Sequence, residues 1–111
     1  MNDNYPVIVK SYELTLWYLK KIEKLPKNHR YSLGEKIQES LLELLLTLSD
    51  AIYTASKKSL LLHANKLIEK VRLLTRLLKD LTLLSIENFR YVSSGLNELG
   101  AMVGGWMKNA K

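Results

Sequence analysis

Arginine and lysine side chains at helical spacing are the groups of this sequence best suited to a chemical task, and that task is contact with phosphate. Arg72, Arg76 and Lys79 recur at steps of four and three residues, so on a helix they line one side. Lys66 and Lys70 form a second row in the same segment. Such rows hold phosphates without reading base sequence. The segment therefore predicts contact with a polyanion, with a solvated charged face as the alternative interpretation.

Further basic residues accompany an aromatic one near the start of the chain. Lys21 and Lys24 share an arc of a predicted first helix with Lys10 and Trp17, and Arg30 lies in the loop that follows. An indole can stack on an unpaired base. Burial at an interface is the favoured interpretation of Trp17.

The charge of the chain is unevenly distributed. The net charge is +6 over 111 residues, and residues 51–79 carry seven basic groups against one acidic group. Residues 35–50 carry four acidic groups against one basic group, and both segments are rich in leucine. Opposite charges on two such segments predict either docking between copies, which closes a ring if the rotation allows, or neutralisation within one copy.

Combinations of residues that support catalysis are missing from the sequence. The two histidines, His29 and His63, have no carboxylate at ligand spacing, and there is no cysteine. Glu35, Glu39 and Glu43 form an i, i+4, i+8 row, but the histidine partners of a carboxylate metal helix are missing. We predict a protein that is not an enzyme, with no catalytic residue, no metal site and no cofactor. A metal-dependent enzyme built on the glutamate row is a minor alternative.

The elements that must position these residues are helices, because apolar residues recur at steps of three and four. We predict one domain with helices over about residues 6–24, 33–55, 59–79 and 86–103. A capping box from Ser32 to Glu35 would begin the second helix, Ser85 would cap the fourth, and Gly104-Gly105 would end it. Short polar connections favour antiparallel neighbours, hence an all-α, antiparallel up-down four-helix bundle.

Each predicted helix has an apolar stripe for the core, and two helices have apolar residues outside it. The core stripes are Ile8, Tyr12, Leu16 and Leu19; Ile37, Leu41, Leu44, Leu45, Leu48 and Ile52; Leu60, Ala64, Leu67, Val71, Leu74 and Leu78; and Phe89, Val92, Leu96, Leu99, Val103 and Trp106. The residues outside the stripes are Leu42, Leu46, Tyr53, Leu62, Leu73 and Leu77. Apolar residues on outer arcs are typical of interfaces, so we predict that they mediate self-association.

Three stretches of the sequence together resemble a known family. They are LPKNHRYSLGEKI at residues 25–37, LLTRLLKDL at residues 73–81 and GGWMK at residues 104–108. These stretches are similar to the accessory variability determinant (Avd) proteins of diversity-generating retroelements. Those proteins belong to a wider four-helix-bundle family that includes proteins encoded in intervening sequences of bacterial 23S ribosomal RNA genes. The resemblance spans nearly the whole chain, and P-K-x-x-R-Y-x-L-G-E is its most specific part.

The resemblance implies a function beyond what spacing indicates. Avd-type proteins are small basic homopentameric barrels that bind the element's reverse transcriptase and nucleic acid. They support error-prone copying of a template-repeat RNA into cDNA, which then replaces a variable repeat. By this resemblance, RNA, DNA or the polymerase would be held through basic residues, which are Arg30, Lys66, Lys70, Arg72, Arg76, Lys79, Lys21 and Lys24.

The same resemblance assigns a structural corner and leaves one alternative function. Pro26, Tyr31, Leu33 and Gly34 would form the corner, and Gly34 would allow close packing by a neighbouring backbone. The alternative is an interaction module of the ribosomal intervening-sequence type, without nucleic-acid binding. The polar start, Met1 to Asn4, and the short apolar runs predict a cytoplasmic protein with no signal peptide and no membrane partner.

Overall fold

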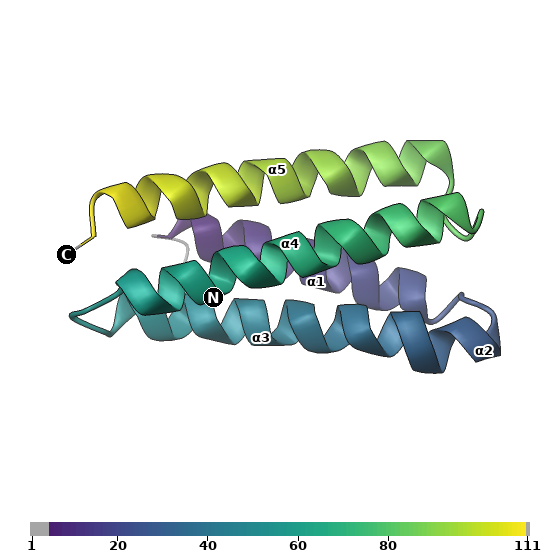
Figure 1. The fold of residues 1–111 in the computed structure, drawn as a ribbon, viewed down its shortest axis with the longest axis horizontal. Coiled ribbons are helices and arrows are strands. Elements are labelled where there is room, and N and C mark those ends of the chain that lie inside the picture. The colour runs from purple at the N-terminus through teal and green to yellow at the C-terminus, as the bar shows by residue number, and fades with distance from the viewer. Residues whose placement is uncertain (1–4, 111) are drawn as a thin grey trace.

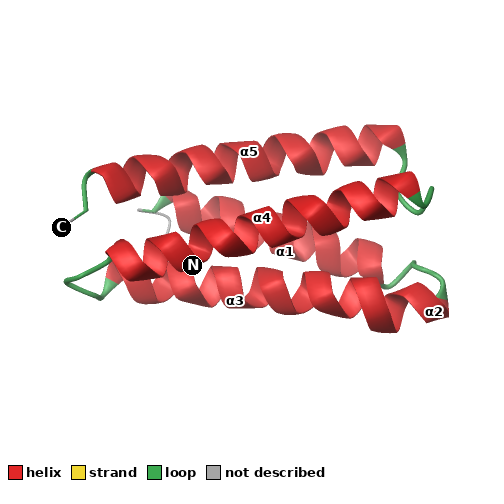
Figure 2. Cartoon of the chain, viewed as in Figure 1, coloured by secondary structure: helices red, strands yellow, loops and turns green. Residues whose placement is uncertain are grey.

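The structure is a computed structural model that describes residues 5–110, which form four long helices and a short helical corner (Figure 1). The long helices are α1 (Pro6–Ile22), α3 (Glu35–Ile52), α4 (Lys58–Asp80) and α5 (Ile86–Lys108). The corner is α2 (Lys27–His29) followed by one π-helical turn, η1 (Arg30–Gly34), which continues into α3. Within residues 5–110 there is no strand (Figure 2). The start at Met1 to Asn4 lies outside the described residues.

The long helices pack side by side in the cyclic order α1, α3, α4, α5, with neighbours antiparallel (Figure 1). The bundle measures 43 × 23 × 22 Å along its principal axes. One end of the bundle carries the α2 corner and the α4–α5 turn, and the other carries the α3–α4 loop and the end of α5 (Figure 1). The predicted all-α, four-helix arrangement is confirmed for the single chain. Its assembly into a barrel stays a prediction.

The buried face of α1 is rotated from the predicted one. Its buried residues are Val7, Ile8, Ser11, Leu14, Thr15, Tyr18 and Ile22. Tyr12 and Leu16 are instead 44% and 43% exposed, so their prediction as core residues was wrong. Leu19 is half-buried.

Close packing between α1 and α5 explains this rotation. Gly95 on α5 is buried, and a Cβ added there would lie 2.6 Å from Cδ2 of Leu14. The two helices therefore approach closely through an arc of α1 that contains small residues, Ser11 and Thr15. The Thr15 hydroxyl donates a 2.7 Å hydrogen bond to the Ser11 carbonyl, which satisfies that hydroxyl inside the core. The predicted stripes of the other three helices are confirmed, since each of their residues is buried or half-buried.

The start of α3 differs from the predicted capping box. The Ser32 hydroxyl donates to the Asn28 carbonyl at 2.9 Å, and α3 has no side-chain cap. The chain is already helical from Lys27, because Pro26 has a fixed φ and its carbonyl accepts the first bonds of the corner, from the N–H groups of residues 29 and 30. The box was wrong because the helical backbone begins before Ser32.

Gly34 is buried in the corner, as a close contact requires. An added Cβ would lie 2.9 Å from Cγ2 of Ile22, whereas the nearest backbone atom, the His29 carbonyl oxygen, would be 3.5 Å away. The expected close contact therefore exists, but the Ile22 side chain makes it and not a backbone.

The last helix begins as predicted and ends later. The Ser85 side chain accepts a 3.0 Å hydrogen bond from the Asn88 N–H, which confirms the cap. Gly104-Gly105 does not end α5, which continues to Lys108. Trp106 and Met107 pack against the core beyond the glycines. That packing offsets the cost of each helical glycine, about 1 kcal/mol relative to alanine.

The α4–α5 turn has the hydrogen bonds of a Schellman motif without its usual glycine. The Leu83 N–H donates to the Leu78 carbonyl and the Thr82 N–H to the Lys79 carbonyl, both at 2.9 Å. Thr82 has φ of 59° and is the one non-glycine residue with positive φ among residues 5–110. A β-branched residue is strained in this left-handed conformation.

We therefore expect Thr82→Gly to raise the free energy of unfolding by about 1 kcal/mol, because glycine adopts positive φ without strain. Urea unfolding followed by circular dichroism at 222 nm measures this effect. Thr82→Val is the matched control and should not stabilise the protein, since valine is also β-branched. Equal stability of the glycine and valine variants would contradict the strain.

Candidate nucleic-acid interface

Arg72 and Lys79 contact α5 from α4, and Arg76 lies between them along α4. Of the three, Arg72 has a structural role. Its guanidinium pairs with Glu69 and donates through Nη2 to the Leu96 carbonyl of α5 at 3.4 Å. It also fills the space beside Gly100, where an added Cβ would lie 2.9 Å from Nη2. Arg72 thus joins α4 to α5, and its side chain is only 35% exposed.

Arg76 and Lys79 are held more weakly. Nε of Arg76 lies 3.3 Å from Oδ2 of Asp80, and both side chains are more than half exposed. Exposed pairs of this kind contribute about 0–1 kcal/mol, so a phosphate can displace the carboxylate. Nζ of Lys79 lies 5.0 Å from the centre of the Phe89 ring, a contact that leaves the ammonium able to donate hydrogen bonds. These two residues can contact a polyanion.

Lys66 and Lys70 lie on the other side of α4. Lys70 lines a groove of about 580 Å³ between α3 and α4 together with Glu39 and Glu43. Across the same two helices, Nε2 of His63 lies 3.3 Å from Oε2 of Glu43. The acidic row of α3 and this basic row of α4 therefore lie side by side within one chain. This arrangement favours neutralisation within a copy for Glu39 and Glu43.

Lys21 and Lys24 lie where α1 meets the start of α5. Nζ of Lys21 is 5.4 Å from the centre of the Trp17 ring, and that ring lies 5.4 Å from the ring of Tyr91. Both lysines line a pocket of about 200 Å³ beside the first turn of α5. Trp17 packs against the core of its own chain. Lys10, which shares their arc, forms a 2.9 Å ion pair with Glu98.

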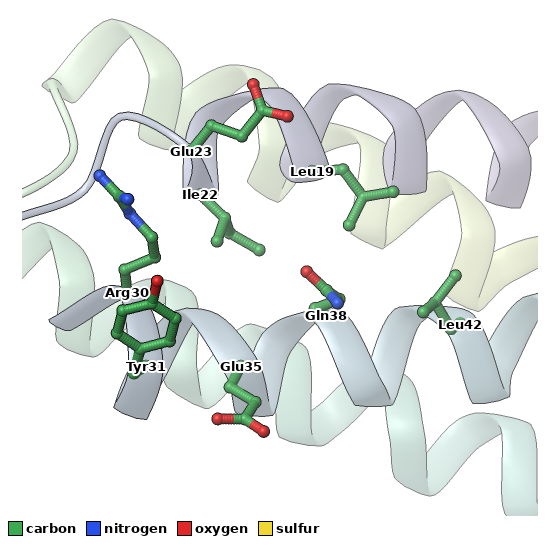
Figure 3. Close-up of a pocket in the computed structure, with 8 residues that line it drawn as sticks. All are labelled: Leu19, Ile22, Glu23, Arg30, Tyr31, Glu35, Gln38 and Leu42. Atoms are coloured by element: carbon green, nitrogen blue, oxygen red, sulfur yellow. The ribbon is translucent and has the colours of Figure 1, made fainter. Parts of the chain in front are cut away.

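Arg30 belongs to the corner. Its Nη2 donates to the Leu25 carbonyl at 3.2 Å, and its buried Nε has no hydrogen-bond partner. Figure 3 shows the guanidinium directed away from the hollow between α1 and α3. Arg30 therefore braces the chain between α1 and α3.

The structure thus divides the eight predicted basic residues among four places. Arg72 and Lys79 contact α5 from α4, with Arg76 between them, and Lys66 and Lys70 lie on the other side of α4. Lys21 at the end of α1 and Lys24 just after it lie beside the first turn of α5, and Arg30 is in the corner. Sequence periodicity places residues on one helix and gives no signal for which neighbouring helix each side will face.

All six predicted interface residues are exposed. The exposed fractions are 40% for Leu42, 65% for Leu46, 81% for Tyr53, 47% for Leu62, 72% for Leu73 and 43% for Leu77. Their role between copies stays a prediction. Tyr12 and Leu16, which sequence reasoning placed in the core, add to the exposed apolar surface of α1.

Neither a cluster of metal ligands nor a membrane-spanning helix occurs in the described part of the chain. No three histidine, cysteine, aspartate or glutamate side chains gather there as metal ligands would. In residues 5–110, no helix combines the length and apolar character needed to cross a membrane.

Comparison with known proteins identifies one family. The sequence model of a family described as bAvd-like matches residues 7–110, which include all four long helices apart from the first residue of α1. No curated protein matches the chain significantly.

Proposed function

Because the chain belongs to the bAvd-like family, we propose that it is a non-catalytic accessory protein of a diversity-generating retroelement. In this role it binds nucleic acid and the element's reverse transcriptase, and so supports mutagenic cDNA synthesis and retrohoming. The observation that carries the proposal is the family match over residues 7–110, since this family is one of accessory proteins. Copies of the chain self-associate, and the resemblance to Avd-type proteins implies a pentamer.

The geometry supports four of the eight predicted basic residues as nucleic-acid contacts in this proposal. Lys79 lies against Phe89 on one flank of α5, with Arg76 three residues earlier on α4, and Lys21 and Lys24 lie beside the first turn of α5 on its other flank. They are at the end that carries the α2 corner (Figure 1). Phosphates held there need no base-specific contact, which suits a protein that binds whatever sequence is being copied. Arg72 and Arg30 are assigned to the fold, because their guanidinium groups bond backbone carbonyls of their own chain.

We expect the double variant R76Q/K79Q to bind RNA more weakly and with less salt dependence. Each phosphate contact contributes about 0.7–0.9 to the slope of log affinity against log salt, so losing two should reduce the slope by about 1.5. Fluorescence anisotropy of a labelled structured RNA, titrated at four salt concentrations, measures both quantities. Arg72 is left intact because its substitution would disturb the contact between α4 and α5.

K58Q/K108Q is the matched control. It removes the same charge from two exposed residues at the opposite end of the bundle (Figure 1). It should retain most of the affinity and of the slope. Equal losses in the two double variants would mean that binding follows net charge and not this surface, and the assignment of Arg76 and Lys79 would be wrong.

The second candidate function is an interaction module without nucleic-acid binding. The observation that favours it is that Arg72, Arg76 and Lys79 each have a partner in their own chain. Wild-type protein that binds no RNA at about 0.15 M salt, while still assembling, would favour this candidate over the first.

A further inference from the structure

One helix of the bundle carries an exposed apolar ridge. Leu62, Leu73 and Leu77 follow the outer side of α4, and they are 47%, 72% and 43% exposed. Lys66 and Lys70 lie between Leu62 and Leu73 along the same side. We call Leu62, Leu73 and Leu77 the α4 ridge. At 1.5 Å per residue it is about 22 Å long.

A groove with exposed apolar residues lies between α1 and α3. We call this the α1/α3 groove, and its exposed apolar residues are Tyr12, Leu16, Leu42, Leu46 and Tyr53. It contains two hollows, one of about 540 Å³ beside Leu42 and one of about 420 Å³ beside Leu46 and Tyr12. From residue 35 to residue 53 it runs along about 27 Å of α3, so the α4 ridge fits within its length.

The hollow beside Leu42 has apolar side chains inside, and its edges carry two carboxylates, of Glu23 and Glu35, and one guanidinium, of Arg30. Figure 3 shows Leu19 and Ile22 of α1, with Leu42 and the Gln38 amide of α3, directed toward the space between the helices. The carboxylates of Glu23 and Glu35 point away from it on either side (Figure 3).

The charges select which surfaces can meet. Two grooves facing each other would place carboxylates against carboxylates, and two ridges would place Lys66 and Lys70 against their own copies. A ridge in a groove brings lysines to carboxylates and leucines to apolar hollows. Glu69 also lies by the ridge, but it is paired with Arg72 of its own chain. Glu39 and Glu43 lie in the groove between α3 and α4, which Lys70 and Leu73 also line, so these carboxylates offset part of the charge of Lys70 within one copy.

We propose that the α4 ridge of one copy inserts into the α1/α3 groove of a second copy. This is a heterologous contact, because the two surfaces differ, and repeating it around a rotation axis closes a ring. It rests on the self-association included in the proposed function, and adds to it the two surfaces and their pairing. The flanks of α5 with Arg76, Lys79, Lys21 and Lys24 stay outside the contact and remain open to nucleic acid.

Two single variants and their mixture test the pairing. Leu73→Asp breaks the ridge and leaves the groove intact, whereas Leu46→Asp breaks the groove and leaves the ridge intact. Size exclusion with light scattering should show a closed oligomer for the wild-type protein and 12.8 kDa monomers for each variant alone. An equimolar mixture at high concentration should form a dimer of twice that mass and nothing larger, because only one intact ridge can meet one intact groove.

Ile86→Asp is the matched control, since Ile86 is 58% exposed on α5, away from both surfaces. It should assemble like the wild-type protein. Circular dichroism spectra of all three variants should match that of the wild-type protein, because each replaced side chain is largely exposed. Thermal melts of Leu73→Asp and Leu46→Asp should match each other and lie below those of the wild-type protein and Ile86→Asp, because assembly itself stabilises the folded chain.

Three results would overturn the proposal. A wild-type monomer would refute self-association altogether, whether or not RNA binds. Wild-type-like oligomers of both variants would show that other surfaces assemble the protein. A mixture that stays monomeric while the wild-type protein is oligomeric would refute the pairing of ridge with groove and leave the nucleic-acid proposal untouched, since the assembly test contains no RNA.

Discussion

Replacing Gly95 by leucine should lower the free energy of unfolding by about 3 kcal/mol, the upper range for an overpacked core. A Cβ at Gly95 would lie 2.6 Å from Cδ2 and 3.4 Å from Cγ of Leu14, and a leucine adds three further carbons. Leu14 is only 3% exposed, so it cannot move aside without opening the contact between α1 and α5. Chemical unfolding monitored by circular dichroism gives the free energy directly.

Gly104 provides the control within the same helix. Nothing lies within 4 Å of a Cβ built at Gly104, so Gly104→Ala should stabilise the protein by about 0.5–1 kcal/mol through helix propensity alone. Gly95→Ala should fall between these results, because the propensity gain offsets part of the collision. A Gly95→Leu variant as stable as the wild-type protein would show that α1 and α5 do not approach closely at this position.

Replacing Tyr18 by phenylalanine should reverse the order of stability between neutral and alkaline pH. The Tyr18 hydroxyl is buried and shares a 2.5 Å hydrogen bond with the Thr75 hydroxyl. Burial raises the pKa of Tyr18 to about 12, and the hydrogen bond with Thr75 partly opposes this rise. Near pH 8 the variant loses the hydrogen bond and should be less stable by about 1 kcal/mol.

At alkaline pH, Tyr18→Phe should be more stable than the wild-type protein. The folded-state pKa lies above the unfolded value of about 10, so the stabilisation is complete below pH 10 and is lost as the pH rises toward 12. By pH 11.5 this loss amounts to about 2 kcal/mol in the wild-type protein and is missing from Tyr18→Phe. The two stability curves should therefore cross between about pH 10 and pH 11.5.

Thr75→Val distinguishes the effect of Tyr18 titration from the effect of losing the hydrogen bond between Tyr18 and Thr75. It removes the same bond but keeps the buried tyrosine, so its stability should still fall steeply above pH 10. Urea titrations at pH 8, 10 and 11.5 of the three proteins give the comparison. Parallel curves for wild type and Tyr18→Phe would show that Tyr18 does not titrate with a raised pKa.

The sequence predicted the elements well because their signals are local. Apolar spacing identified α3, α4 and α5, and the Ser85 cap depends only on residues within one turn. Local signals failed where backbone conformation departed from residue preference. Thr82 occupies a position where glycine is usual, and the helix from Lys27 begins ahead of the predicted capping box.

The buried face of α1 could not be predicted from the sequence of α1 alone. Two apolar arcs exist on that helix, one through Tyr12 and Leu16 and one through Leu14 and Tyr18. The choice depends on Gly95 and Thr75, which lie on other helices and accept Leu14 and Tyr18. The exposed arc then becomes part of the α1/α3 groove, so one packing decision creates the surface proposed for assembly.

By itself, the sequence determined the helical class, the positions of three helical stripes, the basic character of α4 and, through its motifs, the family. Those properties depend on residue type and on spacing within one segment. Only the tertiary structure decided that Arg72 braces α5 while Arg76 and Lys79 remain available for a polyanion. It also decided that Lys66 and Lys70 lie on a different side of α4 from these three residues. Periodicity places a side chain on one side of its own helix. What that side chain meets depends on the rotation and neighbours of every helix, which are set by packing between residues far apart in the chain.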